Sequence, residues 1–240
     1  MASGERMQAL AADIDSIDEV ELFGRVAALQ GLLVEIAGPV RQMRVGSRLR
    51  IEDGPRHSAR CEVVGFRGER AIALPLDPLE GVRMGCRAVI EAGDATIRPS
   101  NSWLGRVVDG RGSPIDGKGP LAQGAVTCHL RAKPPAAHSR QRVGSPIDLG
   151  VRALNTFTTC CRGQRMGIFA GSGVGKSVLF SMLARNVDAD ISVIGLIGER
   201  GREVQEFLQD DLGEEGLARS VVVVATSDEP ALMRKQAAYL

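Results

Sequence analysis

The 240-residue chain is poor in aromatic side chains, in net charge and in long apolar runs, and each shortage excludes a class of function. Aromatic residues make up only 3%, so stacking platforms for single-stranded nucleic acid are not expected. The net charge of +1 provides no basic footprint for nucleic acid or for a membrane surface. No apolar stretch approaches the ~18 residues of a membrane span, and the acidic first 20 residues contain no apolar core of a secretory signal.

Cysteine and histidine are also sparse. The five cysteines are an odd number without a C-x-x-C pair, and two of them, Cys160 and Cys161, are adjacent. We therefore expect reduced, buried thiols in a cytoplasmic protein. The three histidines show no ligand spacing, so a metal site made of protein side chains alone is not expected.

One short segment, residues 170–177, is the clearest functional signal. It reads AGSGVGKS and fits the Walker A pattern, in which glycines let backbone N–H groups turn toward a phosphate. Lys176 would reach the β- and γ-phosphates of a nucleotide, and the Ser177 hydroxyl would ligate Mg²⁺. The candidate phosphate-binding residues are Ala170, Gly171, Ser172, Gly173, Val174, Gly175, Lys176 and Ser177.

A glycine-rich turn can match this pattern by chance, so its flanks matter. Residues 164–169 end in an apolar run, which predicts a buried strand before the loop. After the loop, a helix is predicted that buries one apolar stripe and leaves Ser181 on the other face. A strand followed by a helix is the context that a phosphate loop requires. The apolar stripe consists of Val178, Leu179, Met182, Leu183 and Val187.

A second chemical element follows a predicted strand. Residues 191–197 form a continuous apolar run, typical of a strand that is buried on both faces. The charged turn 198–203 comes next, at the carboxyl end of the strand, where ligands of parallel sheets bind. Glu199 is the candidate to orient an attacking water, and Arg200 and Lys176 complete the catalytic candidates. The alternative is a solvated charged loop.

The pattern changes along the chain predict three parts, 1–21, 22–95 and 96–240. Residues 1–20 show apolar residues at helical spacing, which indicates an amphipathic helix or a frayed extension. Short β-rich runs between glycine and proline turns predict a small β-barrel over 22–95, in which the arginine-rich stretch 48–60 is interpreted as a solvated turn. Strands that alternate with helices then predict an α/β P-loop domain with a parallel sheet, incomplete at the C-terminus.

These segments resemble the flagellar protein-export ATPase, a member of the rotary ATP synthase α/β superfamily that also includes the injectisome ATPases of type III secretion. The similarity extends from about residue 22 to the last residue. The loop sequence GSGVGKSV is closer to the flagellar form than to the injectisome form. The matching segments are LGRVVD at 104–109, PIDG at 114–117, DLGVRA at 148–153, GQRMGIF at 163–169, IGLIGERGREV at 194–204 and VATSDEP at 224–230.

The resemblance implies an N-terminal β-barrel, a RecA-like nucleotide domain and a helical C-terminal domain. It implies a homo-hexamer with ATP sites between subunits, with ATP and Mg²⁺ bound through Lys176 and Ser177, and with Glu199 as the catalytic glutamate. It also implies cytoplasmic partners: the flagellar export apparatus, exported flagellar proteins and a stator-like regulator that binds residues 1–21. Membrane association would then occur only through partners, and no nucleic acid would be bound.

The chain departs from the family pattern at its end and at one loop position. The family's Walker B aspartate, arginine finger, adenine pocket and C-terminal domain would lie beyond Leu240, so we expect weak nucleotide binding and little hydrolysis from this chain alone. Ala170 replaces the first loop glycine, which the pattern tolerates.

Three other functions compete with a flagellar ATPase. Glu199 argues against a non-catalytic nucleotide-binding subunit. An injectisome ATPase is the close alternative within the family. An RNA translocase of the transcription-terminator type would need more aromatic side chains than Phe23 and Phe66, which are the only ones in residues 1–100.

Overall fold

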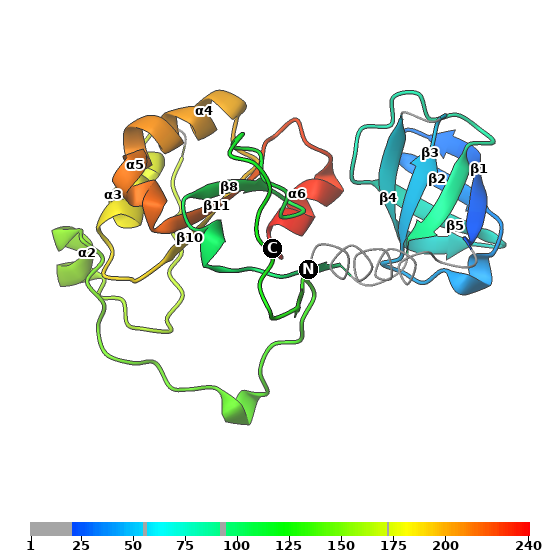
Figure 1. Ribbon diagram of the computed structural model, residues 1–240. Coiled ribbons are helices and arrows are strands. Elements are labelled where there is room, and N and C mark those ends of the chain that lie inside the picture. The colour runs from blue at the N-terminus through cyan, green and yellow to red at the C-terminus, as the bar shows by residue number, and fades with distance from the viewer. Residues whose placement is uncertain (1–20, 55–56, 92–94, 172) are drawn as a thin grey trace, which may run out of the picture. The chain divides into compact units, whose positions relative to one another are not determined.

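The computed structural model describes residues 21–54, 57–91, 95–171 and 173–240 (Figure 1). Its internal contacts divide the chain into two compact units, Met1–Asp94 and Ala95–Leu240. The expected helix within residues 1–20 lies outside the described residues. In the described part of the chain, no helix is long and apolar enough to cross a membrane.

The first unit contains a closed six-stranded antiparallel barrel in the order β1-β2-β5-β4-β3-β6. Closure gives each strand two hydrogen-bonded neighbours and removes open sheet edges. The predicted barrel is therefore confirmed. The strands are β1 (Phe23–Gln30), β2 (Leu33–Ala37), β3 (Arg48–Glu52), β4 (Ser58–Arg67), β5 (Arg70–Pro75) and β6 (Arg87–Glu91), with a short 3₁₀ turn η1 (Val40–Gln42).

The barrel interior is filled by the inward side chains of alternating strand positions. Val34 and Ile36 of β2, and Leu49 and Ile51 of β3, have no exposed surface. They belong to one core cluster, which also contains the buried Cys61. Burial raises the pKa of the Cys61 thiol to about 12, and the negative charge of Asp77 adds to the effect.

The interpretation of residues 48–60 as a solvated turn is wrong. Arg48 and Arg50 lie on β3, and Arg60 lies opposite Arg50 on β4. Apolar residues that alternate with these arginines point into the barrel, so the strands form because one face is fully buried. On the outside, Glu91 lies within ion-pair distance of both Arg50 and Arg60, at 3.8 and 3.6 Å.

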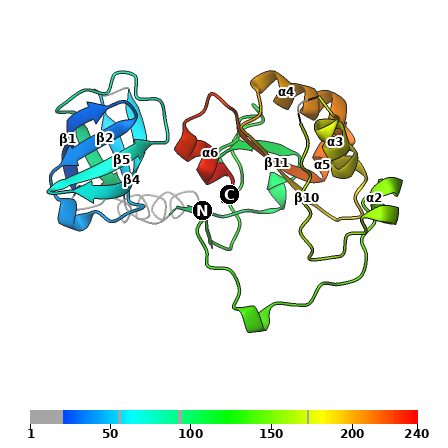
Figure 2. The same ribbon diagram turned by 180° about the vertical axis from the view of Figure 1, so that it is seen from behind.

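The second unit is built on a three-stranded parallel sheet in the order β10-β11-β8 (Figures 1 and 2). The predicted α/β domain with a parallel sheet is confirmed. A separate two-stranded antiparallel ladder pairs β7 (Thr96–Ile97) with β9 (Cys128–His129). The remaining elements are β8 (Arg106–Asp109), β10 (Ser192–Ile197), β11 (Ser220–Ala225), α2 (Arg152–Phe157), α3 (Lys176–Asn186), α4 (Gly201–Glu206), α5 (Gly213–Ala218), α6 (Ala231–Ala237), the 3₁₀ turns η2 (Asn101–Trp103) and η3 (Ala137–Ser139), and the π-helical η4 (Phe207–Leu212).

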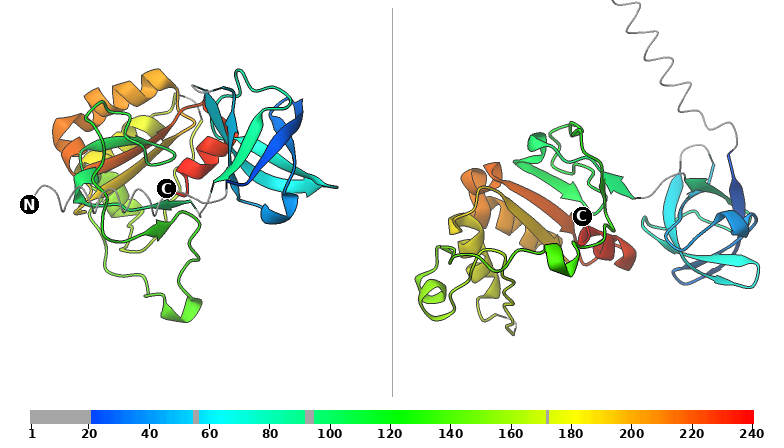
Figure 3. Two further views of the ribbon diagram at one scale, coloured as in Figure 1. Left: turned by 45° about the vertical axis from the view of Figure 1, so that its right-hand side comes forward. Right: turned by 90° about the horizontal axis from the view of Figure 1, so that it is seen from below.

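Helices cover the parallel sheet on both faces (Figure 3). On one face, Ala184 of α3 and Phe207 of η4 pack with Ile194 and Leu196 of β10. On the other face, Ala237 of α6 packs with Val223 and other strand residues. The central strand β11 is therefore buried, as expected for a parallel strand between helical layers.

The strand β10 is less buried than its apolar sequence predicts. Val193 is 72% exposed, so the prediction of burial on both faces is wrong. Residues 164–169 form no strand either, and Phe169 is 95% exposed. A strand needs a ladder partner for its backbone, and within the described residues β10 pairs with β11 alone.

The turn-rich run at 109–120 is fixed to the sheet. It follows β8, a strand that the sequence analysis missed. Arg106 donates from Nε and Nη2 to the two carboxylate oxygens of Asp116 at 2.7 and 2.9 Å. Asp116 also accepts from the backbone of Val107 and Lys118, and the bond from Arg106 is the main reason that its pKa lies well below the usual range.

Candidate nucleotide-binding site

The glycine-rich loop leads directly into α3. Gly173 and Gly175 have φ angles of 76° and 91°, a left-handed region that side chains with a Cβ rarely adopt. Gly175 is the residue before the helix, and α3 begins at Lys176. The loop glycines thus turn the chain so that Lys176 and Ser177 occupy the first helical turn, whose N–H groups have no partner within the helix. Ser172 lies outside the described residues.

The helix α3 buries a different face from the one predicted. Ser181 and Ala184 are its buried residues, whereas Val178 and Met182 are exposed. The Ser181 hydroxyl donates to the backbone oxygen of Ser177 at 2.9 Å, which satisfies its polar group within the helix. The small side chains on this face allow the helix to pack closely against its neighbours.

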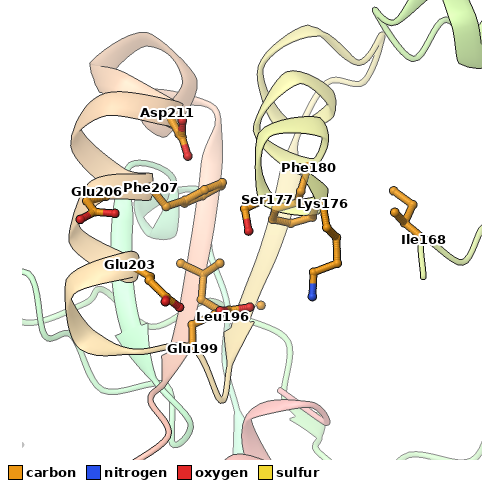
Figure 4. Close-up of a pocket in the computed structure, with 11 residues that line it drawn as sticks. Ile168, Lys176, Ser177, Phe180, Leu196, Glu199, Glu203, Glu206, Phe207 and Asp211 are labelled. Atoms are coloured by element: carbon orange, nitrogen blue, oxygen red, sulfur yellow. The ribbon is translucent and has the colours of Figure 1, made fainter. Parts of the chain in front are cut away.

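A cavity of about 410 Å³ lies between the first turns of α3 and the helical segment α4–η4 (Figure 4). The structure brings Lys176, Ser177 and Glu199 together around it. Arg200 and the described loop residues before Lys176 (170, 171 and 173–175) are not in its lining, so these predicted residues are not brought to the cavity. The complete lining is Ile168, Lys176, Ser177, Phe180, Gly195, Leu196, Glu199, Glu203, Glu206, Phe207 and Asp211.

Glu199 is held at the carboxyl end of β10 by a tight turn. Gly198 has a φ of 80°, and its N–H donates to the backbone oxygen of Ala225 at the end of β11. The backbone oxygen of Glu199 accepts from the N–H of Ser227 at 3.0 Å. The turn that presents Glu199 is therefore attached to the neighbouring parallel strand.

Glu203 closes the same turn from the helix side. Its carboxylate accepts a hydrogen bond at 3.4 Å from the backbone N–H of Arg200, which is the residue before α4. The same carboxylate lies 3.6 Å from the Arg200 guanidinium. The backbone hydrogen bond is the main cause that lowers the pKa of Glu203, and a hydrogen bond with the Glu199 side chain contributes. Arg200 thus contacts Glu203 at the start of α4.

Sequence reasoning missed most of the wall opposite Lys176. Glu203 stands in the same charged turn as Glu199, so its position next to a candidate was a usable signal. Phe207 and Asp211 on that wall, and Phe180 on α3, gave no such signal, because which helix faces meet depends on packing.

The chemistry of this cavity fits a nucleotide polyphosphate with a divalent cation. One wall offers the Lys176 ammonium group, the Ser177 hydroxyl and the positive end of α3, all of which attract an anion. The other wall offers carboxylates at Glu199 and Glu203, which favour a cation or a water molecule between the walls. A glycine-rich loop before a helix, next to a parallel sheet, is the architecture of P-loop nucleotide-binding proteins.

Comparison with known proteins shows which family of P-loop nucleotide-binding proteins the chain resembles. Residues 150–240 match the nucleotide-binding domain of the ATP synthase alpha/beta family, which confirms the resemblance found in the sequence.

Relatives match the chain over most of its length. It is 56% identical over 234 residues to the flagellum-specific ATP synthase of Caulobacter vibrioides and 40% identical over 236 residues to that of Bacillus subtilis, covering 98% of this chain and 53% of each relative. The assembled ATPase EscN of the enteropathogenic E. coli type III secretion system matches with a TM-score of 0.80 and 38% identity, over 90% of this chain and 51% of EscN. The chain thus spans about half the length of the curated relatives it matches.

Proposed function

We propose that this chain binds MgATP at the cavity beside α3 and forms the barrel and nucleotide-binding part of an ATPase that energises flagellar type III protein export. The observation that carries the proposal is the meeting of Lys176, Ser177 and Glu199 around one cavity. The high identity to flagellum-specific ATP synthases favours a flagellar role over an injectisome role, since the match to EscN has lower identity.

Each cavity residue has a distinct task in this proposal. The loop 170–175 and the first amides of α3 hold the phosphates, and Lys176 neutralises charge on the β- and γ-phosphates. Ser177 supplies an oxygen ligand for Mg²⁺, which when bound offsets the negative charge of the phosphates. Glu199 orients the water that attacks the γ-phosphate, and Glu203 holds the turn on which Glu199 lies.

The larger assembly is part of the same proposal. EscN is described as assembled and, in a second structure, as bound to a central stalk, EscO. We infer a homo-hexamer with nucleotide sites between subunits and a cytoplasmic location. Residues 1–21 would bind a stator-like regulator, 22–95 form the barrel and 96–240 form the nucleotide-binding domain. The remaining partners would be the export apparatus and exported flagellar proteins.

We expect this chain alone to bind nucleotide weakly and to turn it over slowly. The lining of the cavity contains Lys176 but no arginine among the described residues. An arginine that reaches the transferred phosphate contributes about 10³–10⁵ in rate in well-studied cases. In the proposed hexamer, a neighbouring subunit would supply it.

Replacement of Glu199 by glutamine tests the catalytic part of the proposal. Glu199→Gln keeps a side chain of the same size but removes the carboxylate that orients water, so single-turnover ATP hydrolysis should slow by about 10²–10⁴. MgATP affinity should change by less than about threefold. Glu214→Gln, on the exposed side of α5, is the matched control and should behave as wild type. An unchanged hydrolysis rate in Glu199→Gln would instead support a non-catalytic nucleotide-binding subunit.

A further inference from the structure

Two phenylalanine rings join the walls of the cavity. The ring centroids of Phe180 and Phe207 lie 5.6 Å apart with an interplanar angle of 26°, and both residues line the cavity. Phe207 is only 6% exposed, whereas Phe180 is 36% exposed. Figure 4 shows the Phe207 side chain reaching from the α4–η4 side toward α3. The pair is therefore an apolar contact across the cavity.

The positions of the two rings connect them to the polar groups of the site. Phe180 follows Ser177 by three residues, so it lies about one turn further along the same face of α3. Phe207 begins η4, which continues α4, and α4 starts directly after the turn that carries Glu199 and is capped by Glu203. A shift of one ring against the other would therefore change the separation of Ser177 and Glu199.

The segment that carries Phe207 is bounded by two glycines with unusual backbone angles. Gly198 has a φ of 80°, and Gly213 has a φ of 63° with a ψ of 179°, conformations that are readily available only to glycine. Between them, the helix changes from α-helical to π-helical at Phe207, a rare geometry that is frequent at functional sites. These glycines are suitable hinges for residues 199–212.

We infer that Phe180 and Phe207 are a positioning pair, which keeps residues 199–212 in register with the first turn of α3 and transmits nucleotide binding from Lys176 and Ser177 to the Glu199 turn. The inference rests on the proposed function, because the signal begins with a nucleotide at the loop. Phosphate contacts fix the first turn of α3, and the stacked rings pass that constraint to η4. Residues 199–212, between the two glycines, then become more ordered.

Hydrogen–deuterium exchange on the 240-residue chain tests this inference. With saturating MgADP, wild type should show slower exchange of the amides in residues 199–212 than without nucleotide. Phe180→Leu and Phe207→Leu keep apolar bulk but remove the stacked pair, and each should reduce this nucleotide-dependent slowing roughly 2- to 10-fold. The fold-change in MgADP affinity should be smaller than the fold-change in the nucleotide-dependent slowing of exchange. Phe180→Tyr retains the ring and should restore the wild-type response.

The control is Phe157→Leu, which removes an 85% exposed ring at the end of α2, outside the cavity. It should leave the response unchanged. If exchange in the leucine variants is accelerated equally with and without nucleotide, the two rings only pack the helices together and do not transmit nucleotide binding. That result would overturn the inference. Binding of MgADP by wild type with no change in residues 199–212 would also overturn it and leave the proposed function intact. No binding of MgADP by wild type would overturn both.

Discussion

The barrel and the parallel sheet differ in how completely their strands are covered. Every barrel strand has two neighbours, and most of its inward side chains are buried. In the described residues of the second unit, β10 has one neighbour, and Val193 faces away from the core. The candidate site lies in the second unit, where a loop and a strand end leave polar groups accessible. Closure thus gives the barrel a stable core, and the incompletely covered unit presents the chemical groups.

The largest expected effect is in the second unit, at the ion pair that fixes residues 110–120. Arg106→Leu leaves the Asp116 carboxylate without the bidentate partner that holds it, which should lower the free energy of unfolding by more than the loss of an exposed ion pair does. The single tryptophan, Trp103, is buried in this unit, so its fluorescence during urea unfolding reports on it. Arg162→Leu breaks an exposed pair and should cost only about 0–1 kcal/mol. Similar losses in both variants would refute this account.

The barrel core provides the matching test of the first unit. Leu49→Ala removes a fully buried side chain from β3 and should lower the free energy of unfolding by about 2–5 kcal/mol. Circular dichroism should show the change, while the Trp103 transition stays near its wild-type midpoint if the two units unfold independently. Val193→Ala, at an exposed strand position, should have a much smaller effect. A Trp103 transition that shifts as much as the circular dichroism would show that the units unfold together.

The two units should also lose stability at opposite ends of the pH scale. The lowered pKa of Asp116 adds stability that is present above its unfolded value of about 4 and is lost as pH falls below that value. The raised pKa of Cys61, about 12, adds stability that is present below its ordinary value of 9.0 and is lost as pH rises from there toward 12. Urea midpoints across pH, compared with Asp116→Asn and Cys61→Ala, measure both effects. If the urea midpoint of wild type changes with pH in the same way as that of Asp116→Asn or Cys61→Ala, the replaced residue is not the cause of the pH dependence, which would contradict the account for that residue.

Sequence alone predicted the parts of the fold that are encoded locally. The loop 170–177 and the helix after it follow from residues adjacent in the chain, and most barrel strands are delimited by nearby turns. The strand β3 was missed because arginines alternate with its buried residues. The strand β8 was missed because it is four residues long and its partner β11 lies more than a hundred residues later.

The site was predicted only as far as its motifs extend. Lys176, Ser177 and Glu199 belong to recognisable patterns, and the structure brings them to one cavity. Phe180 and Phe207 were not foreseen, because the buried face of α3 depends on which helix packs against it. The apolar stripe of α3 predicted one face, whereas contact with η4 and the satisfied hydroxyl of Ser181 select another.

The affinity of the chain for MgATP with and without the loop lysine tests the central claim most directly. Lys176→Ala removes a charged donor to phosphate worth about 1.5–3 kcal/mol, so the dissociation constant measured by retention of radiolabelled ATP should rise roughly 10- to 150-fold. Lys176→Arg should also bind more weakly, since the loop is shaped for an ammonium group. Lys235→Ala, on the exposed side of α6, should bind as wild type does. Wild-type retention of ATP by both Lys176 variants would contradict the account.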